Sequence, residues 1–397
     1  MTPHRTRLDG LGCWLAEAAS QSGLEVLFPG FCRELVARGF AVWRGSMGLE
    51  VLHPEVSGSM YVWTDESADI RVTGRARVAQ SASYLRSPTR VVDETNRTFR
   101  RRLDAPLPEW PLLEELREVG ATDYVMFPLP FLDTTRTAVM SFAARRAQGF
   151  QDIDIAELET AARLFSPYAE RHVLRRIAID LLDTYVGPRT GRRIIEGQVE
   201  RGEFETIEAA IWFADLRGFT RRTEETSLDE VLADLNAWFD AMVGVIDEHG
   251  GEVLKFIGDA ALAIFPVGPQ RSETGACADA LAAAASFAER RDGLNGERRA
   301  DGRPALVDGI ALHLGEVAYG NVGAPRRLDF TVIGPAVNRA SRLLELAKRL
   351  GQPVVVSDGF ARALGRPLVP LGRHELRGVP EPMDVFAPDR SGALREA

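Results

Sequence analysis

Cysteine is scarce in this sequence, which holds only Cys13, Cys32 and Cys277 among its 397 residues. The three positions are scattered and none belongs to a Cys-x-x-Cys pair. This spacing excludes a disulfide framework and gives no indication of a zinc site. We therefore expect reduced, partly buried thiols.

Long apolar runs and an excess of basic residues are also missing. No apolar run reaches the roughly 18 residues that span a bilayer, and residues 1–5 are not followed by the apolar core of a secretory signal. The 48 basic and 57 acidic residues give a net charge of -9, which argues against binding nucleic acid through its phosphates. We expect a cytoplasmic protein with no membrane span and no nucleic-acid partner.

The composition that remains is that of a globular protein, with 45% hydrophobic and 26% charged residues. The length predicts about two to three domains. The first ~150 residues mix helical and strand periodicities, which indicates one α/β unit. Its expected elements are a helix within 28–38, strands at 40–44, 49–53 and 60–64, an antiparallel pair at 124–131 and 138–144, and a helix at 154–165.

Aromatic and basic residues of this unit allow two interpretations each. Trp43, Tyr61, Trp63 and Trp110 could line a ligand pocket, but aromatic side chains in strands more often belong to the core, which we favour. The arginines at positions 97 and 100–102 favour a solvated loop over an anion site.

An apolar stripe at helical spacing occupies residues 155–185. Pro167 interrupts it and lacks an N–H for an interior hydrogen bond, so we expect two helices that meet at a kink. The stripe can be buried against a second copy of itself or against its own domain, and the sequence favours neither. Its apolar members are Leu158, Ala162, Phe165, Leu174, Ile177 and Leu181.

Two acidic residues stand out in the following region. Asp215 ends a predicted strand, and Asp259 lies in the Gly258-Asp259 turn of a predicted hairpin. Between them, Ser227 and Glu230 form a capping box that starts a helix. Pairing of the strands could bring both carboxylates to one sheet edge, where a hard cation such as Mg²⁺ would be needed. Either aspartate alone is more often a structural turn residue.

The remaining elements complete a β-α-β-β-α-β order, the ferredoxin-like pattern, so the expected fold class is α+β. They are a helix at 272–291, a strand pair at 306–314 and 316–321, and a strand at 330–333. Pro335 suits the first turn of a further helix, which presents Asn338 and Arg342 on one face. This pair suits a ribose and a phosphate, although such pairs are more often a solvated helix face.

Residues 196–388 resemble the class III adenylyl cyclases. The motifs that carry the resemblance are 213–220 (FADLRGFT), 251–259 and 337–342 (VNRASR). The resemblance implies a homodimer with shared active sites and two Mg²⁺ or Mn²⁺ ions per site. It implies metal binding by Asp215, Leu216 and Asp259, purine recognition by Lys255 and Thr331, ribose orientation by Asn338, charge stabilisation at the α-phosphorus by Arg342, and triphosphate binding by Arg326 or Arg327.

The base preference follows from hydrogen-bonding chemistry. Lys255 and the Thr331 hydroxyl can bond the edge of adenine, whereas guanine would favour an acidic partner. The family's more familiar purine residue is Asp, and Thr331 resembles a bacterial subgroup that uses ATP. We expect an adenylate cyclase that converts ATP to 3′,5′-cyclic AMP and pyrophosphate. The alternatives are a guanylate cyclase and a catalytically silent nucleotide-binding regulator.

A diguanylate cyclase is disfavoured, because its signature continues differently after Gly250-Gly251-Glu252. The N-terminal region resembles a GAF-type sensory domain, with residues 149–154 as the usual approach to its last helix. This resemblance implies regulation by an unknown small-molecule or protein signal. The predicted organisation is a GAF-like domain at 1–152, a helical linker at 153–195, a cyclase domain at 196–388 and a flexible tail at 389–397.

Overall fold

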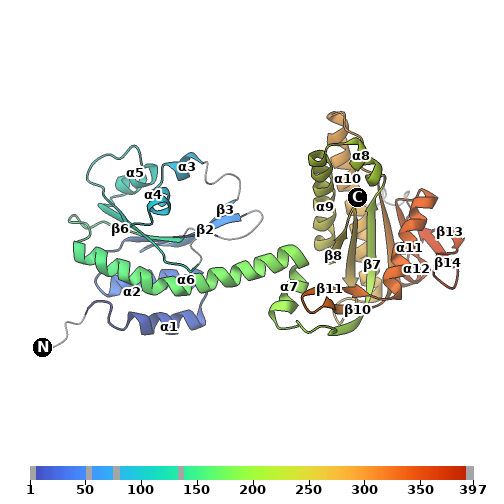
Figure 1. Cartoon of the computed structure of the whole chain (residues 1–397), viewed down its shortest axis with the longest axis horizontal. Coiled ribbons are helices and arrows are strands. Elements are labelled where there is room, and N and C mark those ends of the chain that lie inside the picture. The colour runs from blue at the N-terminus through green and yellow to red at the C-terminus, as the bar shows by residue number, and fades with distance from the viewer. Residues whose placement is uncertain (1–5, 51–55, 75–80, 133–137, 390–397) are drawn as a thin grey trace. The chain divides into compact units, whose positions relative to one another are not determined.

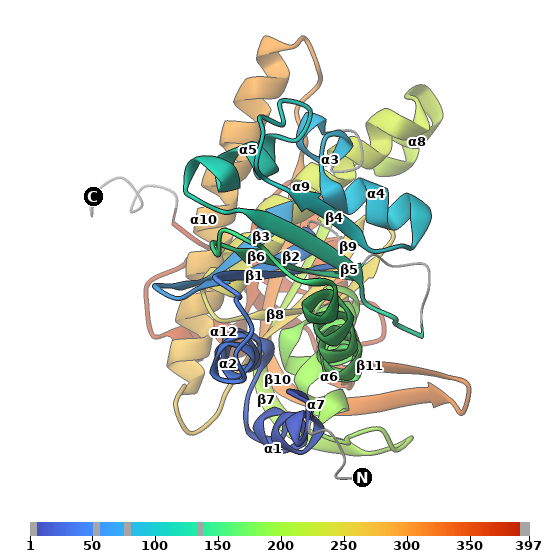
Figure 2. The same cartoon turned by 90° about the vertical axis from the view of Figure 1, so that its left-hand side faces the viewer.

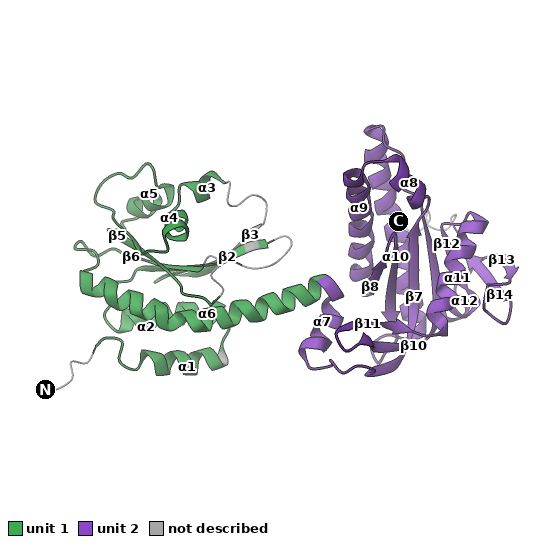
Figure 3. Ribbon diagram, viewed as in Figure 1, with its two compact units in different colours: residues 1–184 green, residues 185–397 purple. Residues whose placement is uncertain are grey.

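The computed structural model describes residues 6–50, 56–74, 81–132 and 138–389. The chain divides into two compact units, residues 1–184 and 185–397 (Figure 3). None of the described helices has the length and apolar character needed to cross a membrane. The three cysteines are free, as expected, with Cys32 and Cys277 buried and Cys13 exposed. Apart from Asp389, the predicted tail lies outside the described residues.

The N-terminal unit contains a six-stranded sheet in the order β3-β2-β1-β6-β5-β4, and all neighbouring strands are antiparallel. The predicted pair β5–β6 is confirmed. The predicted strand at 40–44 is wrong, because pairing begins only at Arg44, and residues 51–53 of the predicted strand 49–53 lie outside the described residues. The strands are β1 Arg44–Glu50, β2 Val56–Thr64, β3 Ala68–Gly74, β4 Phe99–Arg102, β5 Asp123–Pro128 and β6 Ala138–Ala144.

Helices cover both faces of this sheet (Figure 2). One apolar cluster joins the sheet to α1, α2 and α6, and a second joins it to α4 and α5. Strand β6 is therefore buried on both faces, which explains its continuous apolar sequence. The bounds are α1 Leu11–Gln21, α2 Leu24–Ala37, α3 Ala82–Leu85, α4 Pro88–Thr95, α5 Pro111–Glu118 and α6 Asp152–Val186.

Helix α6 is one continuous helix, so the predicted division at Pro167 is wrong. Packing outweighs the lost hydrogen bond, because Leu158, Phe165 and Val173 bury one side of the helix in the core of its own unit. Ile177 of the stripe also belongs to this core, whereas Leu174 and Leu181 are exposed.

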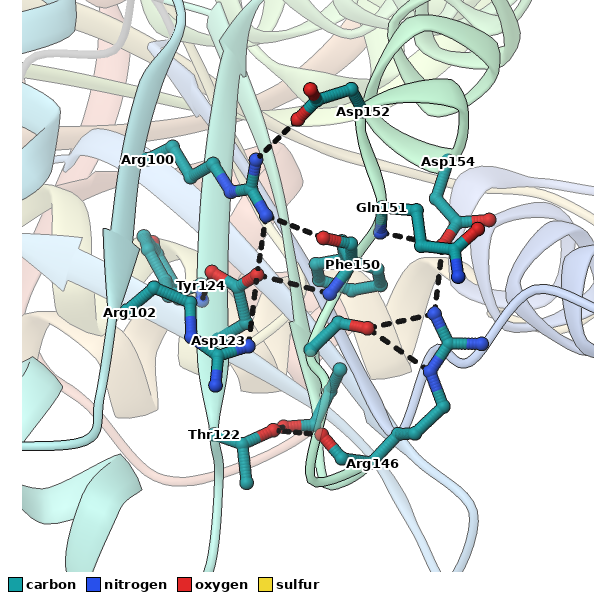
Figure 4. Close-up of polar contacts among 12 residues, drawn as sticks. Arg100, Arg102, Thr122, Asp123, Tyr124, Arg146, Phe150, Gln151, Asp152 and Asp154 are labelled. Carbon is teal, nitrogen blue, oxygen red and sulfur yellow. Dashed lines mark hydrogen bonds and ion pairs between the residues drawn. The ribbon is translucent and has the colours of Figure 1, made fainter.

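The arginines at 100–102 lie in β4, so the predicted solvated loop is also wrong. Arg100 donates to the buried carboxylate of Asp123 at 3.0 Å and also pairs with the exposed Asp152 at 3.2 Å. Asp123 accepts further hydrogen bonds from the backbone N–H groups of Phe150 and Tyr124 (Figure 4). The network ties β4 and β5 to the start of α6.

The four aromatic residues do not share one pocket. Trp43 and Trp63 line a cavity of about 500 Å³, and Tyr61 lines a separate one of about 170 Å³. Trp110 packs against Phe99, with ring centroids 5.2 Å apart. No cavity found among the described residues is lined by all four, and the core interpretation holds best for Trp63, which is 5% exposed.

The C-terminal unit contains an eight-stranded sheet in the order β13-β14-β12-β10-β7-β9-β8, with β11 paired to β10 (Figure 1). Its central part confirms the expected β-α-β-β-α-β order through β7, α9, β8, β9, α10 and β10. The strands are β7 Phe204–Leu216, β8 Glu252–Ile257, β9 Ala260–Pro266, β10 Asp308–Ala324, β11 Arg327–Ile333, β12 Val354–Ser357, β13 Val369–His374 and β14 Met383–Ala387.

Strand β10 is one long strand, so the predicted pair at 306–314 and 316–321 is wrong. Its pairing with β7 continues through Gly315, which lies opposite Ala209. A Cβ at Gly315 would lie 2.8 Å from the Cβ of Ala336. This glycine therefore permits the close approach of a helix and does not mark a turn.

Helices α9, α10 and α12 pack on one face of this sheet, and α11 packs on the other. Helix α9 begins as expected, with Ser227 Oγ accepting from the backbone N–H of Glu230 at 3.4 Å. The bounds are α7 Pro188–Ile195, α8 Phe219–Glu225, α9 Leu228–Glu248, α10 Glu273–Ala300, α11 Pro335–Leu350 and α12 Asp358–Leu364.

Candidate active site

The structure brings Asp215 and Asp259 to one sheet edge, as the strand pairing predicts. Strand β7 pairs with β9 so that Asp215 lies opposite Ala260, the residue after Asp259. The backbone N–H of Leu216 donates to the carbonyl oxygen of Asp259 at 3.1 Å. The side chain of Leu216 is a buried hydrocarbon without a ligand atom. This residue can therefore offer a cation only its carbonyl oxygen.

Gly309 makes room for charged groups at this edge. It lies opposite Asp215 in the pairing of β10 with β7. A Cβ at this position would lie 3.2 Å from Asp215 Oδ1 and 2.9 Å from Arg217 Nη2. The Arg217 guanidinium also donates to the carbonyl oxygen of Gln352. The absent side chain of Gly309 thus leaves space for a carboxylate and a guanidinium side by side.

The Asp215 carboxylate has an unsatisfied hydrogen-bond acceptor. Its Oδ1 is buried and has no hydrogen bond within the part of the chain that the structure describes. Burial raises the pKa of Asp215, Arg217 opposes this shift, and the charge of Asp259 adds to it. A buried carboxylate with a second one beside it is stabilised by a cation.

The donor set fits a hard divalent ion, because it offers two carboxylates and a main-chain carbonyl. Mg²⁺ is commonly held by one or two carboxylates, with water and substrate phosphates completing its shell. A larger protein-only ligand set is not found, because the described residues contain no group of three or more His, Cys, Asp or Glu side chains placed for a metal.

Helix α11 carries the predicted ribose and phosphate residues. Pro335 occupies its first turn, and Asn338 and Arg342 follow one turn apart on the accessible side. Arg342 forms an ion pair with Glu345, a partner that the sequence analysis missed although it lies three residues further on the same helix.

Within one protomer, Asn338 and Arg342 are not linked to the two aspartates. No hydrogen bond or ion pair of the described side chains links Asp215 or Asp259 to Asn338 or Arg342. The residue of α11 whose charge reaches Asp215 is Lys348. It lies about 15 Å along the helix axis from Asn338, at 1.5 Å per residue.

Lys255 forms an ion pair with Asp329, which the sequence analysis did not single out. Asp329 precedes Thr331 by two positions on β11, so both side chains lie on one face of the strand. The alternation of side chains along a strand, with a period of two residues, was the sequence signal that could have pointed to Asp329. Thr331 is 9% exposed, whereas Arg326 lies exposed in the turn between β10 and β11 and shows no hydrogen bond or ion pair to another described residue.

Part of the chain is similar to known nucleotide cyclases. Residues 203–386 match the family of adenylate and guanylate cyclase catalytic domains. The chain is 36% identical over 173 residues to an adenylate cyclase of Anabaena cylindrica, covering 43% of this chain and 33% of that protein. It is 32% identical over 256 residues to adenylate cyclase 1 of Rhizobium meliloti, covering 60% of this chain and 37% of that protein.

Among solved structures, the chain is similar to the adenylyl cyclase CyaB from P. aeruginosa, with 24% identity, a TM-score of 0.43, and coverage of 46% of this chain and 94% of that one. The chain spans about a third of the length of the two curated relatives.

The C-terminal unit is a mixed α/β domain with paired carboxylates at a sheet edge. The comparisons support an adenylate and guanylate cyclase catalytic domain at residues 203–386. The matched range lies inside the predicted 196–388. The GAF resemblance of the N-terminal unit, the predicted domain boundaries and the cytoplasmic location stay predictions.

Proposed function

We propose that this chain is an adenylate cyclase that converts ATP to 3′,5′-cyclic AMP and pyrophosphate. The observation that carries the proposal is Asp215 Oδ1, which is buried beside Asp259 without a hydrogen-bond partner in the described part of the chain, within the range that matches cyclase catalytic domains. The two curated relatives named as adenylate cyclases support ATP as the substrate.

At the α-phosphorus, the proposed reaction forms one P–O bond and breaks one. The ribose 3′-hydroxyl gives up its proton to solvent, its oxygen bonds to the α-phosphorus, and pyrophosphate leaves with the former bridging oxygen. Mg²⁺ or Mn²⁺ ions, two per site, would be held by Asp215, Asp259 and the Leu216 carbonyl. Bound there, they supply stabilisation of the 3′-oxygen and neutralisation of the leaving phosphates.

The side chains of α11 supply orientation and charge. Asn338 bonds the ribose, which lowers the orientational cost of in-line attack. Arg342 offers a guanidinium to the oxygens of the transferring phosphoryl group. Since Arg342 pairs with Glu345 in the free protein, the nucleotide must replace that carboxylate with a phosphate. Arg326 or Arg327, in or beside the exposed turn, is available for the triphosphate.

Lys348, whose charge reaches Asp215, lies far along α11 from Asn338. This separation favours an active site that two protomers share. We place Asp215 and Asp259 of one protomer opposite Lys255, Thr331, Asn338 and Arg342 of its partner in a two-fold homodimer. An isologous dimer then has two identical sites. The N-terminal unit would regulate this domain through a small-molecule or protein signal.

Guanylate cyclase activity is the second candidate, and one observation favours it. The Asp329 carboxylate pairs with Lys255 at the purine position. An acidic side chain there could accept from the ring N–H and amino group of guanine. For ATP, Lys255 and the Thr331 hydroxyl would instead bond adenine, and Asp329 would only orient Lys255.

The direct test is product identification with the full chain. Purified protein is incubated with ATP or GTP and with Mg²⁺ or Mn²⁺, and the products are separated and identified. We expect cyclic AMP to predominate. Predominant cyclic GMP would establish the second candidate, and no cyclic product with any combination would leave a silent nucleotide-binding regulator.

Variants at the purine position sharpen the test. Lys255→Glu combined with Thr331→Cys reverses donor and acceptor, so ATP use should fall more than GTP use. Asp329→Asn is the matched variant: if ATP is the substrate, it should change the ATP:GTP ratio less than the double variant does. An unchanged ratio in the double variant would remove Lys255 from the site.

A further inference from the structure

A buried carboxylate of the C-terminal unit is held by three neutral donors. Glu252, the first residue of β8, is 3% exposed. Its Oε1 accepts hydrogen bonds from the backbone N–H and the hydroxyl of Thr190, each at 3.0 Å. Its Oε2 accepts from the Tyr319 hydroxyl, also at 3.0 Å. Thr190 and Tyr319 are buried as well, so loss of any one of these bonds leaves a buried polar group without its partner.

This network joins segments that lie far apart in the sequence. Thr190 belongs to α7, which precedes the range 203–386 that matches cyclase catalytic domains, and Tyr319 belongs to β10. Helix α7 makes a second contact with the same region, because Arg189 Nη2 donates to the carbonyl oxygen of Gly250 at 3.2 Å. The beginning of β8 is therefore fixed by a helix outside the matched range.

Strand β8 contains a bulge directly after this anchor. Its pairing with β9 shifts register between Val253 and Lys255. Glu252 lies opposite Ile264, and Lys255 lies opposite Leu262. Because the two β9 residues are two positions apart, Glu252 and Lys255 point to the same face of the sheet. Without the extra residue they would point to opposite faces, since three positions separate them.

The direction of Lys255 therefore depends on the strand register. On this face Lys255 pairs with Asp329 of β11. Both side chains are exposed, by 43% and 46%, and an ion pair of this kind contributes little to stability. The hydrogen bonds of Glu252 are buried and lie three residues away along the same strand. They are better suited than the ion pair to hold the bulge in place.

We propose that Glu252 is a positioning residue for Lys255. Its three hydrogen bonds hold the register of β8 that directs Lys255 towards the purine, and the bonds from Thr190 make this register depend on α7. The inference rests on the proposed role of Lys255 in purine recognition. It adds that base recognition responds to a segment that precedes the matched range.

The kinetic test uses the full chain with ATP. A lysine that holds the base before and during the reaction contributes to KM more than to kcat. We expect Glu252→Ala to raise KM about tenfold, Tyr319→Phe and Thr190→Val to raise it several-fold, and kcat to change less in each. Glu252→Gln keeps one acceptor and should restore part of the loss seen in Glu252→Ala. Ser357→Ala is the matched control, because it removes a buried hydroxyl with hydrogen bonds elsewhere in the unit.

KM should stay at the wild-type value in Ser357→Ala. An equal rise of KM in Ser357→Ala and Tyr319→Phe would overturn the proposal, because it would show only a general loss of stability.

A double variant shows whether Glu252 acts through Lys255. Lys255→Met should raise KM by itself, and Glu252→Ala should add nothing in that background. The same factor in both backgrounds would overturn the proposal. If Lys255→Met raises KM and the Glu252 variants do not, this inference alone fails. If Lys255→Met leaves KM unchanged, the proposed role of Lys255 fails and this inference fails with it. Tyr319→Phe replaces Glu252→Ala in the cycle if the latter does not fold.

Hydrogen exchange tests the positioning without any substrate. Tyr319→Phe and Glu252→Gln should speed exchange of the backbone amides at 252–257, because the strand loses part of its anchor. Ser357→Ala should leave exchange there unchanged. Wild-type exchange at 252–257 in both network variants would overturn the proposal, whichever nucleotide proves to be the substrate.

Discussion

The carboxylates of Asp154 and Asp215, one in each unit, have opposite surroundings. In the N-terminal unit, burial alone would raise the pKa of Asp154, yet the backbone N–H of Gln151 and the guanidinium groups of Arg7 and Arg146 lower it (Figure 4). In the C-terminal unit, burial raises the pKa of Asp215, and its Oδ1 has no hydrogen-bond partner among the residues that the structure describes. A buried carboxylate whose oxygens all have hydrogen-bond or ion-pair partners stabilises the fold. A buried carboxylate oxygen without such a partner indicates a binding site for a group that the chain does not supply.

The unsatisfied groups also differ in kind between the units. In the N-terminal unit the Tyr124 hydroxyl, which can donate, is buried without a hydrogen-bond partner among the described residues. In the C-terminal unit Asp215 Oδ1 is a buried acceptor without such a partner, and an acceptor of this kind calls for a cation. The same accounting of buried hydrogen-bonding groups therefore assigns different chemistry to the two units.

The largest expected effect is on catalysis. Asp215→Ala and Asp259→Ala should each lower turnover about a thousandfold or more, because each removes a ligand worth several kcal/mol of transition-state stabilisation. The fold should persist, since Asp215 Oδ1 makes no hydrogen bond that the substitution would break. Steady-state rates and circular dichroism of the two variants check this. Appreciable Mg²⁺-dependent turnover by a folded Asp259→Ala protein would refute the two-carboxylate site.

The next effect is on stability, and it concerns the N-terminal network. Asp123→Ala should lower the free energy of unfolding by about 3 kcal/mol, because it removes the buried partner of Arg100 and the acceptor of two backbone N–H groups. Asp152→Ala is the matched control. It removes the exposed partner of the same arginine and should cost below about 0.5 kcal/mol. Denaturant unfolding measures both, and equal losses would mean that Asp123 is not the centre of the network.

A smaller effect, the change of stability with pH, has opposite signs for Asp154 and Asp215. The pKa of Asp154 is lowered on folding, so its ionised form stabilises the fold above its unfolded pKa, and this is lost as pH falls. Asp154→Asn should therefore destabilise the protein at pH 7 and much less at pH 3. The pKa of Asp215 is raised on folding, so its stabilising protonated form is lost as pH rises.

Asp215→Asn should accordingly raise the unfolding temperature at pH 7, measured without divalent ions, and leave it nearly unchanged at pH 3. Unfolding temperatures of both variants across pH 3 to 7 check the signs. Shifts of the same sign at pH 7 would contradict the comparison between the units.

The sequence predicts which elements carry the candidate residues better than it predicts the contacts that those residues make. Asp215, Asp259, Asn338 and Arg342 follow from local signals, namely strand ends, a hairpin turn and helical spacing. The pairing of Lys255 with Asp329 depends on the approach of β8 to β11, which no local pattern encodes.

The errors have the same origin. Pro167 and Gly315 are local interruption signals, and in both cases tertiary packing prevails. The first lies in a helix whose buried side is part of a core, and the second lies in a strand paired along its length. Arg100 looks like a solvated charge until the fold brings Asp123 beside it.

The measurement that tests the central account most directly is complementation between two inactive chains. Asp215→Ala and Arg342→Ala are co-expressed, and turnover is compared with that of an Asp215→Ala and Asp259→Ala mixture. In the first mixture each heterodimer has one intact site, so random exchange predicts roughly a quarter of the wild-type rate. In the second mixture every site lacks a ligand, and we expect no recovery. Failure of both mixtures despite proven heterodimers, or equal recovery in both, would contradict a shared site built from the Asp215 edge and helix α11.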